Sequence, residues 1–243
     1  MSFENIGIIT QARMTSTRLP GKILKTINGT PLLKFHIERL KLAECKLILA
    51  TTVNDTDDTV SKFAEFENIL IHRGSENNVL ERFYQAADKY KLDVIVRVTS
   101  DCPLIDGLVI KEALGQYQEW NNPRIYYSNC LVRTFPRGFD FEIFSFELLQ
   151  DAFINAKELS DFEHVTPYIN KNKSGNVIIK DYVLKNDFSN FRLTVDTPED
   201  FQLIELLVDK YGAEEKGQRE IIDILLKNPE LSKINAHIEQ KKV

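Results

Sequence analysis

The sequence predicts an α/β fold: a doubly wound, mainly parallel sheet with helices on both faces. Three observations lead to this fold class. Strand-length apolar runs alternate with helical segments from residue 6 to residue 120, the loops between them are short, and polar loops follow the expected strands. Parallel strands end at a common edge of such a sheet, so we expect these loops to meet where open α/β sheets bind ligands.

Alternation is clearest in the first half of the chain, where apolar runs predict strands and apolar residues at helical spacing predict helices. The expected strands are Ile6–Thr10, Lys46–Thr52, Ile69–His72 and Asp93–Thr99. The expected helices are Pro31–Ala43, a segment from Asn54 to about Phe66, a segment after Asn78 to about Tyr90, and Ile105–Trp120. His36 lies on the apolar face of the first helix, so we expect a core or boundary histidine and not a catalyst.

The second half is less regular. The expected strands are Ile125–Asn129, Phe135–Phe144, Val177–Leu184 and Phe191–Val195, and the expected helices are Phe146–Ala156, Ser160–Asn170 and a segment from Pro198 to about Tyr211. Ser160 and Glu163 have the spacing of a helix start. Alternation in Phe135–Phe144 places Asp140 and Glu142 on one side of a strand. Without a visible linker, we expect one domain over residues 1–243 with a small β-rich insertion, a lobe at about 125–190.

The composition is that of a soluble globular protein. The 243 residues are 43% hydrophobic and 28% charged, which allows a sizeable core. The net charge of −5 does not favour nucleic acid or an anionic membrane. We see no signal peptide and no apolar run near 20 residues in length. The three cysteines are far apart in the sequence, which indicates a protein of a reducing compartment. Their spacing is not that of zinc ligands. We expect a cytoplasmic protein that binds neither nucleic acid nor membrane.

The loop Gln11–Lys22 (QARMTSTRLPGK) follows the first expected strand. It combines three cations, Arg13, Arg18 and Lys22, with small or hydroxyl residues such as Ser16. Exposed backbone N–H groups, little bulk and fixed positive charge suit a triphosphate. We interpret this loop as a triphosphate cradle, with a solvated basic loop as the alternative, because short motifs often match by chance.

Two common nucleotide-binding motifs do not occur in the sequence. Neither G-x-G-x-x-G nor G-x-x-x-x-G-K-[ST] is present. A dinucleotide dehydrogenase and a Walker-type ATPase therefore lose support.

Two acidic residues, Asp101 and Asp196, each follow an apolar strand-like run. Carboxylates at strand ends beside a phosphate cradle suit Mg²⁺, which prefers oxygen ligands from one or two carboxylates, phosphates and water. The alternatives are a turn residue before Pro103 for Asp101 and a helix N-cap for Asp196. Together with the cradle, the pair favours a magnesium site.

These motifs resemble a known family. The loop QARMTSTRLPGK, the turn SDCPLID and the segment VDTPED are similar to the signature of the sugar-acid cytidylyltransferases, which include 3-deoxy-manno-octulosonate and acylneuraminate cytidylyltransferases. The segments RGSENNVLERF, RVTSDCPLID, PRGFDFEIF and FEHVTPYI most resemble the branch of spore coat polysaccharide biosynthesis protein F. The resemblance extends from residue 6 to about residue 205.

The resemblance implies a nucleotide-diphospho-sugar transferase-like fold, Mg²⁺ dependence and transfer of CMP from CTP to a small acceptor in surface polysaccharide biosynthesis, with release of pyrophosphate. It also implies a homodimer. The nucleotide-binding residues that it implies are Gln11, Ala12, Arg13, Ser16, Arg18, Lys22, Arg73, Ser75 and Asp101, with Arg73 and Ser75 near the base. Arg18, Lys22 and Asp101 would be catalytic, and Asp101 and Asp196 would hold the metal.

The acceptor side departs from the octulosonate enzymes, which usually carry Gly-Asp-Glu-Pro where this chain has Ser100-Asp101-Cys102-Pro103. The sugar acid therefore stays open. We expect Cys102 to be a small packing residue and not a nucleophile. The residues expected to line the acceptor pocket are Arg133, Arg137, Asp140, Glu142, Glu163 and His164. A solvated strand face or helix surface is the alternative for Asp140, Glu142 and His164.

Other functions remain open at this point. The chain could use another nucleoside triphosphate, or could be a glycosyltransferase that uses a finished nucleotide sugar. It could also be a non-catalytic nucleotide-binding module. Nucleotide preference and the released product distinguish these functions.

Overall fold

The central sheet has seven strands in the order β5-β4-β1-β6-β8-β7-β9. The structure is a computed structural model, and it describes residues 3–239. The strands are β1 (Ile6–Gln11), β4 (Lys46–Thr52), β5 (Leu70–Gly74), β6 (Val94–Thr99), β7 (Ile125–Ser128), β8 (Glu142–Ser145) and β9 (Ile178–Asp181). A separate hairpin consists of β2 (Thr26–Ile27) and β3 (Thr30–Pro31). The predicted α/β class is confirmed.

Parallel pairing connects β5, β4, β1 and β6, whereas β8 runs antiparallel to both β6 and β7. In β1, Ile8 and Ile9 point to opposite faces of the sheet, and both are fully buried. This burial on two faces is what a continuous apolar run predicts for a central parallel strand. Strands β7, β8 and β9 continue this sheet, so the strands of the segment 125–190 form no sheet of their own. The predicted division into domains stays a prediction.

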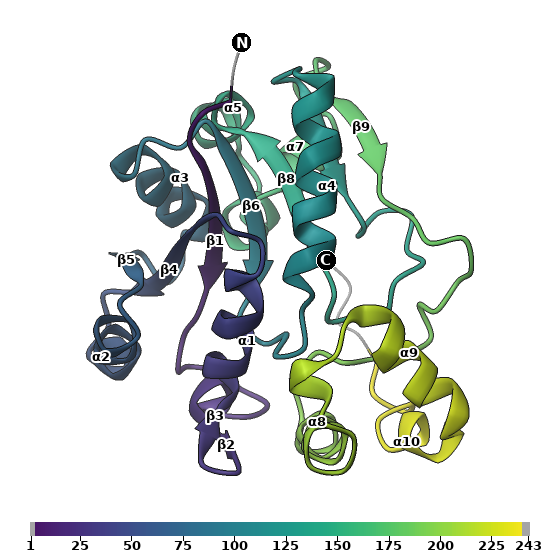
Figure 1. Cartoon of the computed structure of the whole chain (residues 1–243). Coiled ribbons are helices and arrows are strands. Elements are labelled where there is room, and N and C mark those ends of the chain that lie inside the picture. Colours follow the sequence, from purple (N-terminus) through teal and green to yellow (C-terminus); the bar gives the residue numbers. More distant parts are fainter. Residues whose placement is uncertain (1–2, 240–243) are drawn as a thin grey trace.

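Helices cover both faces of the sheet (Figure 1). Helices α3 (Val79–Lys89), α5 (Phe146–Asn155) and α7 (Pro167–Asn170) pack with Ile9 on one face. Helices α1 (Leu32–Lys41) and α4 (Gly107–Trp120) pack with Ile8 on the other. The remaining helical segments are η1 (Lys22–Leu24), η2 (Asp55–Asp57), α2 (Asp58–Phe66), α6 (Leu159–His164), α8 (Pro198–Tyr211), η3 (Ala213–Glu215), α9 (Gln218–Lys227) and α10 (Pro229–Lys233).

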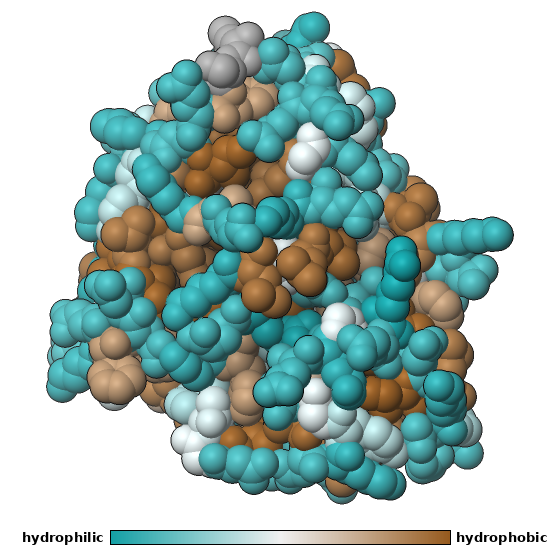
Figure 2. Space-filling view, in the orientation of Figure 1, coloured by the Kyte–Doolittle hydropathy of each residue, from teal (hydrophilic) through white to brown (hydrophobic). Residues whose placement is uncertain are grey.

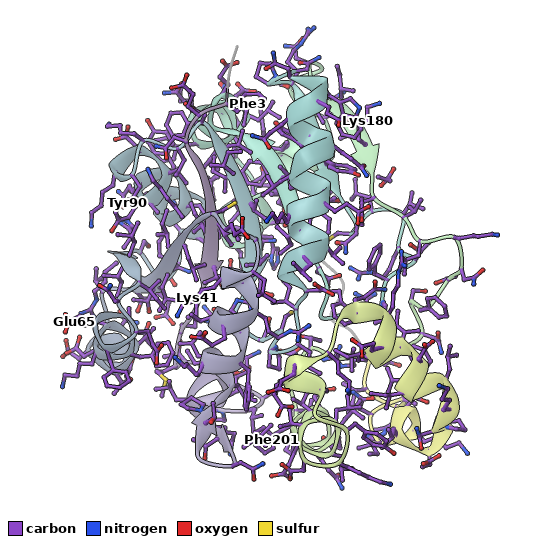
Figure 3. All side chains as sticks on the ribbon, in the orientation of Figure 1. Phe3, Lys41, Glu65, Tyr90, Lys180 and Phe201 are labelled. Carbon is purple, nitrogen blue, oxygen red and sulfur yellow. The ribbon has the colours of Figure 1, made fainter. Side chains whose placement is uncertain are left out.

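The C-terminal helices α8, α9 and α10 form a layer beyond the carboxyl ends of the central strands (Figure 1). Their apolar residues share a core with Leu19 and Ile27, which follow β1 in the chain. Figure 3 shows Phe201 of α8 and Phe3, which precedes β1, at opposite ends of the molecule. This layer places the residues before α8 next to the loop that follows β1.

Surface polarity is mixed, and Figure 2 shows hydrophobic residues in several separate patches on one face of the molecule. Scattered apolar surface of this kind is normal for a folded domain. No helix in the described part of the chain has the length and apolar character needed to cross a membrane.

Two predicted strands are wrong. Of Phe135–Phe144, only the end is a strand, because Gly138 has φ +107° and the chain turns there. Asp140 therefore lies before β8, whereas Glu142 is its first residue, so the two do not share a strand face. The segment Phe191–Val195 is not a strand, since a single bridge pairs Arg137 with Arg192. The local sequence pattern predicted two strands, but the two segments pair with each other only at one bridge and so do not form a ladder.

Two smaller differences concern helices. The predicted helix start at Ser160 and Glu163 is formed instead by Glu158 and Asp161, whose side chain and backbone groups make a capping box. The other difference is helix α10, for which the sequence predicted no helix. The observed helix boundaries differ by a few residues from those that the apolar periodicity predicts, because capping contacts and not the apolar stripe determine where a helix begins and ends.

His36 is buried, as predicted, and it connects three elements. Its Nδ1 donates to the carbonyl oxygen of Cys102 at 2.8 Å, and its Nε2 lies 2.8 Å from the Thr10 hydroxyl. That hydroxyl also lies 2.8 Å from the hydroxyl of Ser100. A neutral ring satisfies both contacts with one donor and one acceptor. Helix α1 thereby fixes the turn that carries Asp101.

The buried ring makes stability depend on pH. Burial lowers the pKa of His36 to about 4, so the unfolded chain binds more protons than the folded chain between pH 4 and pH 6.5. Stability is therefore full above about pH 6.5 and falls as the pH approaches 4. We expect the free energy of unfolding to fall by up to about 3 kcal/mol more in the wild type than in His36→Gln between pH 7 and pH 4.

Urea denaturation at several pH values measures this difference. His237→Gln, which changes an exposed histidine, is the matched control and should keep the wild-type slope. Equal pH slopes for the wild type and His36→Gln would show that the pKa of His36 is the same in the folded and the unfolded chain.

Candidate active site

The loop after β1 is held by contacts to the segments that follow β4 and β5. The Met14 N–H donates to Asp57 Oδ1 at 2.7 Å, and the Thr15 hydroxyl donates to Glu76 Oε1 at 2.6 Å. Gly21 has φ +67° and donates its N–H to the Met14 carbonyl at 3.0 Å. A left-handed residue closes the loop here, a conformation that glycine adopts without steric cost. The loop therefore has a defined shape beyond the carboxyl end of β1.

Most residues of the predicted cradle lie along this loop, but they do not form one cluster. Gln11 accepts a bond from Arg97 at 3.5 Å, and Ala12 is buried. The Ser16 hydroxyl accepts from the Leu19 N–H at 3.4 Å. Arg13 lies 3.9 Å from Glu76, and its side chain is 46% exposed. Arg18 and Lys22 turn toward the segment before α8 instead.

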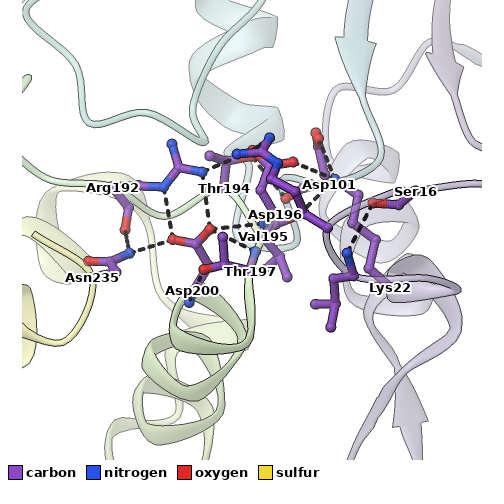
Figure 4. Close-up of polar contacts among 12 residues, drawn as sticks. Ser16, Lys22, Asp101, Arg192, Thr194, Val195, Asp196, Thr197, Asp200 and Asn235 are labelled. Carbon is purple, nitrogen blue, oxygen red and sulfur yellow. Dashed lines mark hydrogen bonds and ion pairs between the residues drawn. The ribbon is translucent and has the colours of Figure 1, made fainter. Parts of the chain in front are cut away.

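Lys22 brings together three segments that are distant in the sequence (Figure 4). Its ammonium donates to Asp101 Oδ2 at 2.9 Å, to Asp196 Oδ1 at 2.8 Å and to the Val195 carbonyl at 2.8 Å. The Val195 N–H also donates to the Asp101 carbonyl at 2.8 Å. The two predicted metal-binding carboxylates therefore lie on either side of one buried cation.

Asp196 has further cationic partners. Its Oδ2 lies 3.0 Å from Arg18 and 2.9 Å from Arg192. Arg192 was not predicted, and it is buried. A second buried acid, Asp200, accepts two bonds from Arg192, at 2.8 and 3.0 Å. Arg192 thus connects the Asp196 carboxylate to helix α8.

Asp200 fixes the start of α8. It accepts bonds from the N–H groups of Asp196 at 3.0 Å and Thr197 at 3.1 Å, which completes a capping box with Thr197. The Asn235 amide donates to Asp200 Oδ1 at 2.8 Å and to the Arg192 carbonyl at 3.0 Å. The spacing of Thr197 and Asp200 in the sequence is the one signal that could have indicated this acid.

The charges of this cluster stabilise one another. Burial works against the charged form of Lys22, but Asp101 and Asp196 outweigh it and raise the pKa of the ammonium. Burial likewise opposes the charged form of Asp101, but Lys22 outweighs it and holds the pKa of that carboxyl well below its usual value. Both groups are therefore charged at neutral pH.

The oxygen atoms around Lys22 fit a divalent cation. Two carboxylates and a carbonyl converge on one position, and a cation already occupies it. Within residues 3–239, no group of three or more His, Cys, Asp or Glu residues could hold a metal ion. A metal at this position would need phosphate or water oxygens as additional ligands, which is typical of Mg²⁺ in nucleotide sites.

Arg73 and Ser75 lie at the end of β5, apart from the Lys22 cluster. The Arg73 guanidinium bonds to the carbonyls of Thr52 at 2.8 Å and Asn54 at 2.9 Å, and lies 2.7 Å from Asp58. The Ser75 hydroxyl accepts from the Asn78 N–H at 3.1 Å. Both side chains thus hold loops in place.

A surface pocket of about 390 Å³ lies beside this loop and the cradle. Its lining residues are Arg13, Glu76, Asn77, Asn78, Leu159, Phe162 and Glu163. Arg13 of the cradle and the expected acceptor residue Glu163 both line this pocket. Asn78 also caps α3 by accepting from the Glu81 N–H at 3.0 Å.

The other expected acceptor residues fall into two groups. Arg133 pairs with Asp140, and the nearby Arg137 uses its N–H and carbonyl to bond Phe191 at 3.0 Å and Leu193 at 2.7 Å. Gly138 allows this close approach, because a Cβ atom there would lie 2.7 Å from the Leu193 backbone.

Glu142 belongs to a buried network. It pairs with Arg97, and its Oε1 accepts from the hydroxyls of Tyr126 and Thr166, both at 2.6 Å. The alternative of a solvated face does not apply to Glu142, which is only 5% exposed. His164 is half-buried, and burial lowers its pKa. Arg97 was not predicted, and it is the central cation of this network.

Cys102 is buried, as expected for a packing residue. Burial raises the pKa of its thiol well above the usual value, and the Asp101 charge adds to that effect. A thiol with a raised pKa is a poor nucleophile.

Comparison with known proteins agrees with this geometry. Residues 7–241 match the family described as Cytidylyltransferase. The chain belongs to this family. It is therefore a nucleotidyltransferase, and the resemblance noted in the sequence is confirmed. Enzymes of this class typically use a divalent metal.

Individual relatives cover almost the whole chain. The structure of a cytidylyltransferase from Leptospira borgpetersenii serovar Hardjo-bovis is 34% identical, covers 98% of this chain and 99% of that one, and has a TM-score of 0.89. Spore coat polysaccharide biosynthesis protein SpsF of Bacillus subtilis is 31% identical over 93% of this chain and 96% of its own. A CMP:2-keto-3-deoxy-manno-octonic acid synthetase structure, complexed with CTP, shares the fold alone, at 16% identity and a TM-score of 0.58 over 84% of this chain and 98% of that one.

The buried Arg192–Asp200 pair should contribute strongly to stability. Asp200→Asn removes the charge that faces the buried guanidinium, so we expect the free energy of unfolding to fall by about 3 kcal/mol. Urea denaturation measures the loss. Glu199→Gln, one position earlier on α8 and with no ion pair among the described residues, is the control and should change stability little. Equal stability of the two variants would contradict this role of Asp200.

Proposed function

We propose that the protein transfers CMP from CTP to a sugar acid or related small acceptor, releases pyrophosphate and serves surface polysaccharide biosynthesis. The observation that carries this proposal is the Lys22 cluster, which combines two cations, Lys22 and Arg18, with two convergent carboxylates beyond the sheet edge. The names of the Bacillus relative and of the CTP-complexed fold neighbour support the acceptor class and the nucleotide.

Arg18 and Lys22 would bind the triphosphate, with Arg13, Ser16 and the backbone of Gln11 and Ala12 along the same loop. An acceptor oxygen would attack the α-phosphorus in line, and negative charge would grow on the phosphate oxygens and on the leaving pyrophosphate. Fixed cations at that position stabilise the developing charge, so Arg18 and Lys22 would act on rate more than on binding.

Asp101 and Asp196 would hold Mg²⁺. When bound, the metal neutralises phosphate charge and orients the triphosphate. The chain's own contribution is to position the carboxylates: Arg192 holds the far oxygen of Asp196, and Lys22 lies between the two acids in this structure. His36 holds the turn that carries Asp101 through its hydrogen bond to the Cys102 carbonyl.

On the acceptor side, we propose that Arg137, Asp140 and His164 contact the acceptor. Glu142 would act by holding Arg97, since both of its carboxylate oxygens already have protein partners. A phosphate acceptor would need no general base, whereas a hydroxyl acceptor would benefit from one. Arg73 and Ser75 would shape the loop next to the base. The homodimer and the cytoplasmic location belong to the same proposal.

Nucleotide binding tests the donor half of the reaction. We expect calorimetry with CTP, UTP, GTP and ATP to show Mg²⁺-dependent selectivity for CTP. Asp101→Ala should weaken CTP binding about tenfold or more in the presence of Mg²⁺, because a metal ligand is lost. Asp223→Ala, an exposed acid on α9, is the control. Equal binding of all four nucleotides, or of none, would refute the cytidylyltransferase proposal and shift support to the alternative functions.

Turnover tests the chemical step. With CTP, Mg²⁺ and a panel of sugar acids, we expect pyrophosphate release, and we expect Arg18→Gln to lower kcat by about 10²-fold through loss of charge stabilisation. Arg124→Gln, at an exposed arginine, should leave kcat unchanged. Release of a nucleoside diphosphate would indicate a glycosyltransferase. Nucleotide binding without any turnover would indicate a non-catalytic module.

A further inference from the structure

All three N–H groups of the Lys22 ammonium are already used in hydrogen bonds. An ammonium has three N–H groups, and three oxygen atoms accept from it: Asp101 Oδ2 at 2.9 Å, Asp196 Oδ1 at 2.8 Å and the Val195 carbonyl at 2.8 Å. The Lys22 side chain is 11% exposed. In this state Lys22 faces the carboxylates, and its ammonium has no N–H left to donate to a phosphate (Figure 4).

The same oxygen atoms are those that a divalent cation would take. Mg²⁺ binds carboxylate oxygens at about 2.0–2.1 Å, which is closer than the ammonium lies to either acid. A metal that took Asp101 Oδ2 and Asp196 Oδ1 would therefore need the position of Nζ. Lys22 and such a metal compete for these two oxygen atoms.

Charge in the cluster is already balanced. Lys22, Arg18 and Arg192 provide three positive charges, and they face three carboxylates, those of Asp101, Asp196 and Asp200. A divalent metal alone would add two positive charges and would leave the Lys22 ammonium buried without its anions. Burial of an unpaired charge is costly. A triphosphate removes both costs, because it brings negative charge and offers new oxygen partners to Lys22 and Arg18.

We propose that Lys22 occupies the metal position until the triphosphate arrives, so that metal binding is conditional on nucleotide binding. The proposal rests on the metal and nucleotide sites of the proposed function. On nucleotide binding, the ammonium exchanges carboxylate oxygens for phosphate oxygens, and the metal takes the vacated position. Coupling between two ligands is reciprocal, so the metal strengthens triphosphate binding by the factor by which the triphosphate strengthens metal binding.

Mn²⁺ binding in the absence of nucleotide tests the proposal directly. Electron paramagnetic resonance reports free Mn²⁺ without requiring turnover. We expect weak binding to the wild type and binding at least about tenfold tighter to Lys22→Met, within the usual range of site coupling. Lys25→Met, at an exposed lysine three positions along the chain, should behave as the wild type. Asp101→Asn in the Lys22→Met background should remove the gain and so locate the metal.

A matched variant separates displacement from simple loss of charge. Arg18→Met removes one positive charge from the same carboxylate, Asp196, but leaves the Lys22 ammonium in place. We expect its gain in Mn²⁺ affinity to be severalfold smaller than that of Lys22→Met. Equal gains in the two variants would overturn the proposal. Lys22→Gln, which keeps a polar group of similar length, serves in the same comparison if Lys22→Met does not fold.

Calorimetric titration with CTP, with and without Mn²⁺, measures the coupling itself. We expect Mn²⁺ to strengthen CTP binding to the wild type more than to Lys22→Met. Wild-type protein that binds Mn²⁺ alone as tightly as Lys22→Met would overturn the conditional binding and leave the metal site of the proposed function intact. Failure of all variants to bind Mn²⁺, with or without CTP, would refute that metal site and this inference together.

Discussion

The contact between Lys22 and the two carboxylates of Asp101 and Asp196 is the interaction on which the rest of the site depends. These residues come from the loop after β1, the turn after β6 and the segment before α8. Burial of a lysine is unfavourable unless anions compensate it. The two acids provide that compensation, so their ion pairs with Lys22 connect the three segments. A backbone hydrogen bond from the Val195 N–H to the Asp101 carbonyl joins two of these segments at the same place.

The C-terminal helices explain how the segment before α8 reaches this position. Their apolar side chains share a core with Leu19 and Ile27 near the cradle. Asp200 at the start of α8 then holds Arg192, and Arg192 holds Asp196. Asn235 extends this support from beyond α10. A carboxylate at the sheet edge is therefore positioned by residues up to 39 positions later in the chain, which makes the C-terminal layer a part of the site.

The sequence predicted what depends on local pattern and on the geometry of parallel sheets. Strand ends such as Thr99 meet other strand ends at one edge, so Asp101 could be placed near the cradle from the alternation of elements alone. Arg192 and the burial of Glu142 could not be predicted, because each depends on partners brought close by tertiary packing. The predicted strand through Gly138 is wrong for the same reason: contact with the Leu193 backbone overrides local alternation.

The acids and the cations of the site differ in how firmly they are held. Asp196 is fixed through Arg192, Asp200 and the first turn of α8, and Asp101 is fixed through the turn that His36 supports. Arg18 has a single ion pair among the described residues and a side chain that is 31% exposed, and Arg13 is more exposed still. Long, flexible cationic side chains can change partners at low cost, whereas short acids in a rigid frame cannot. The frame thus fixes the anions, whereas the side chains of Arg13 and Arg18 are held less firmly.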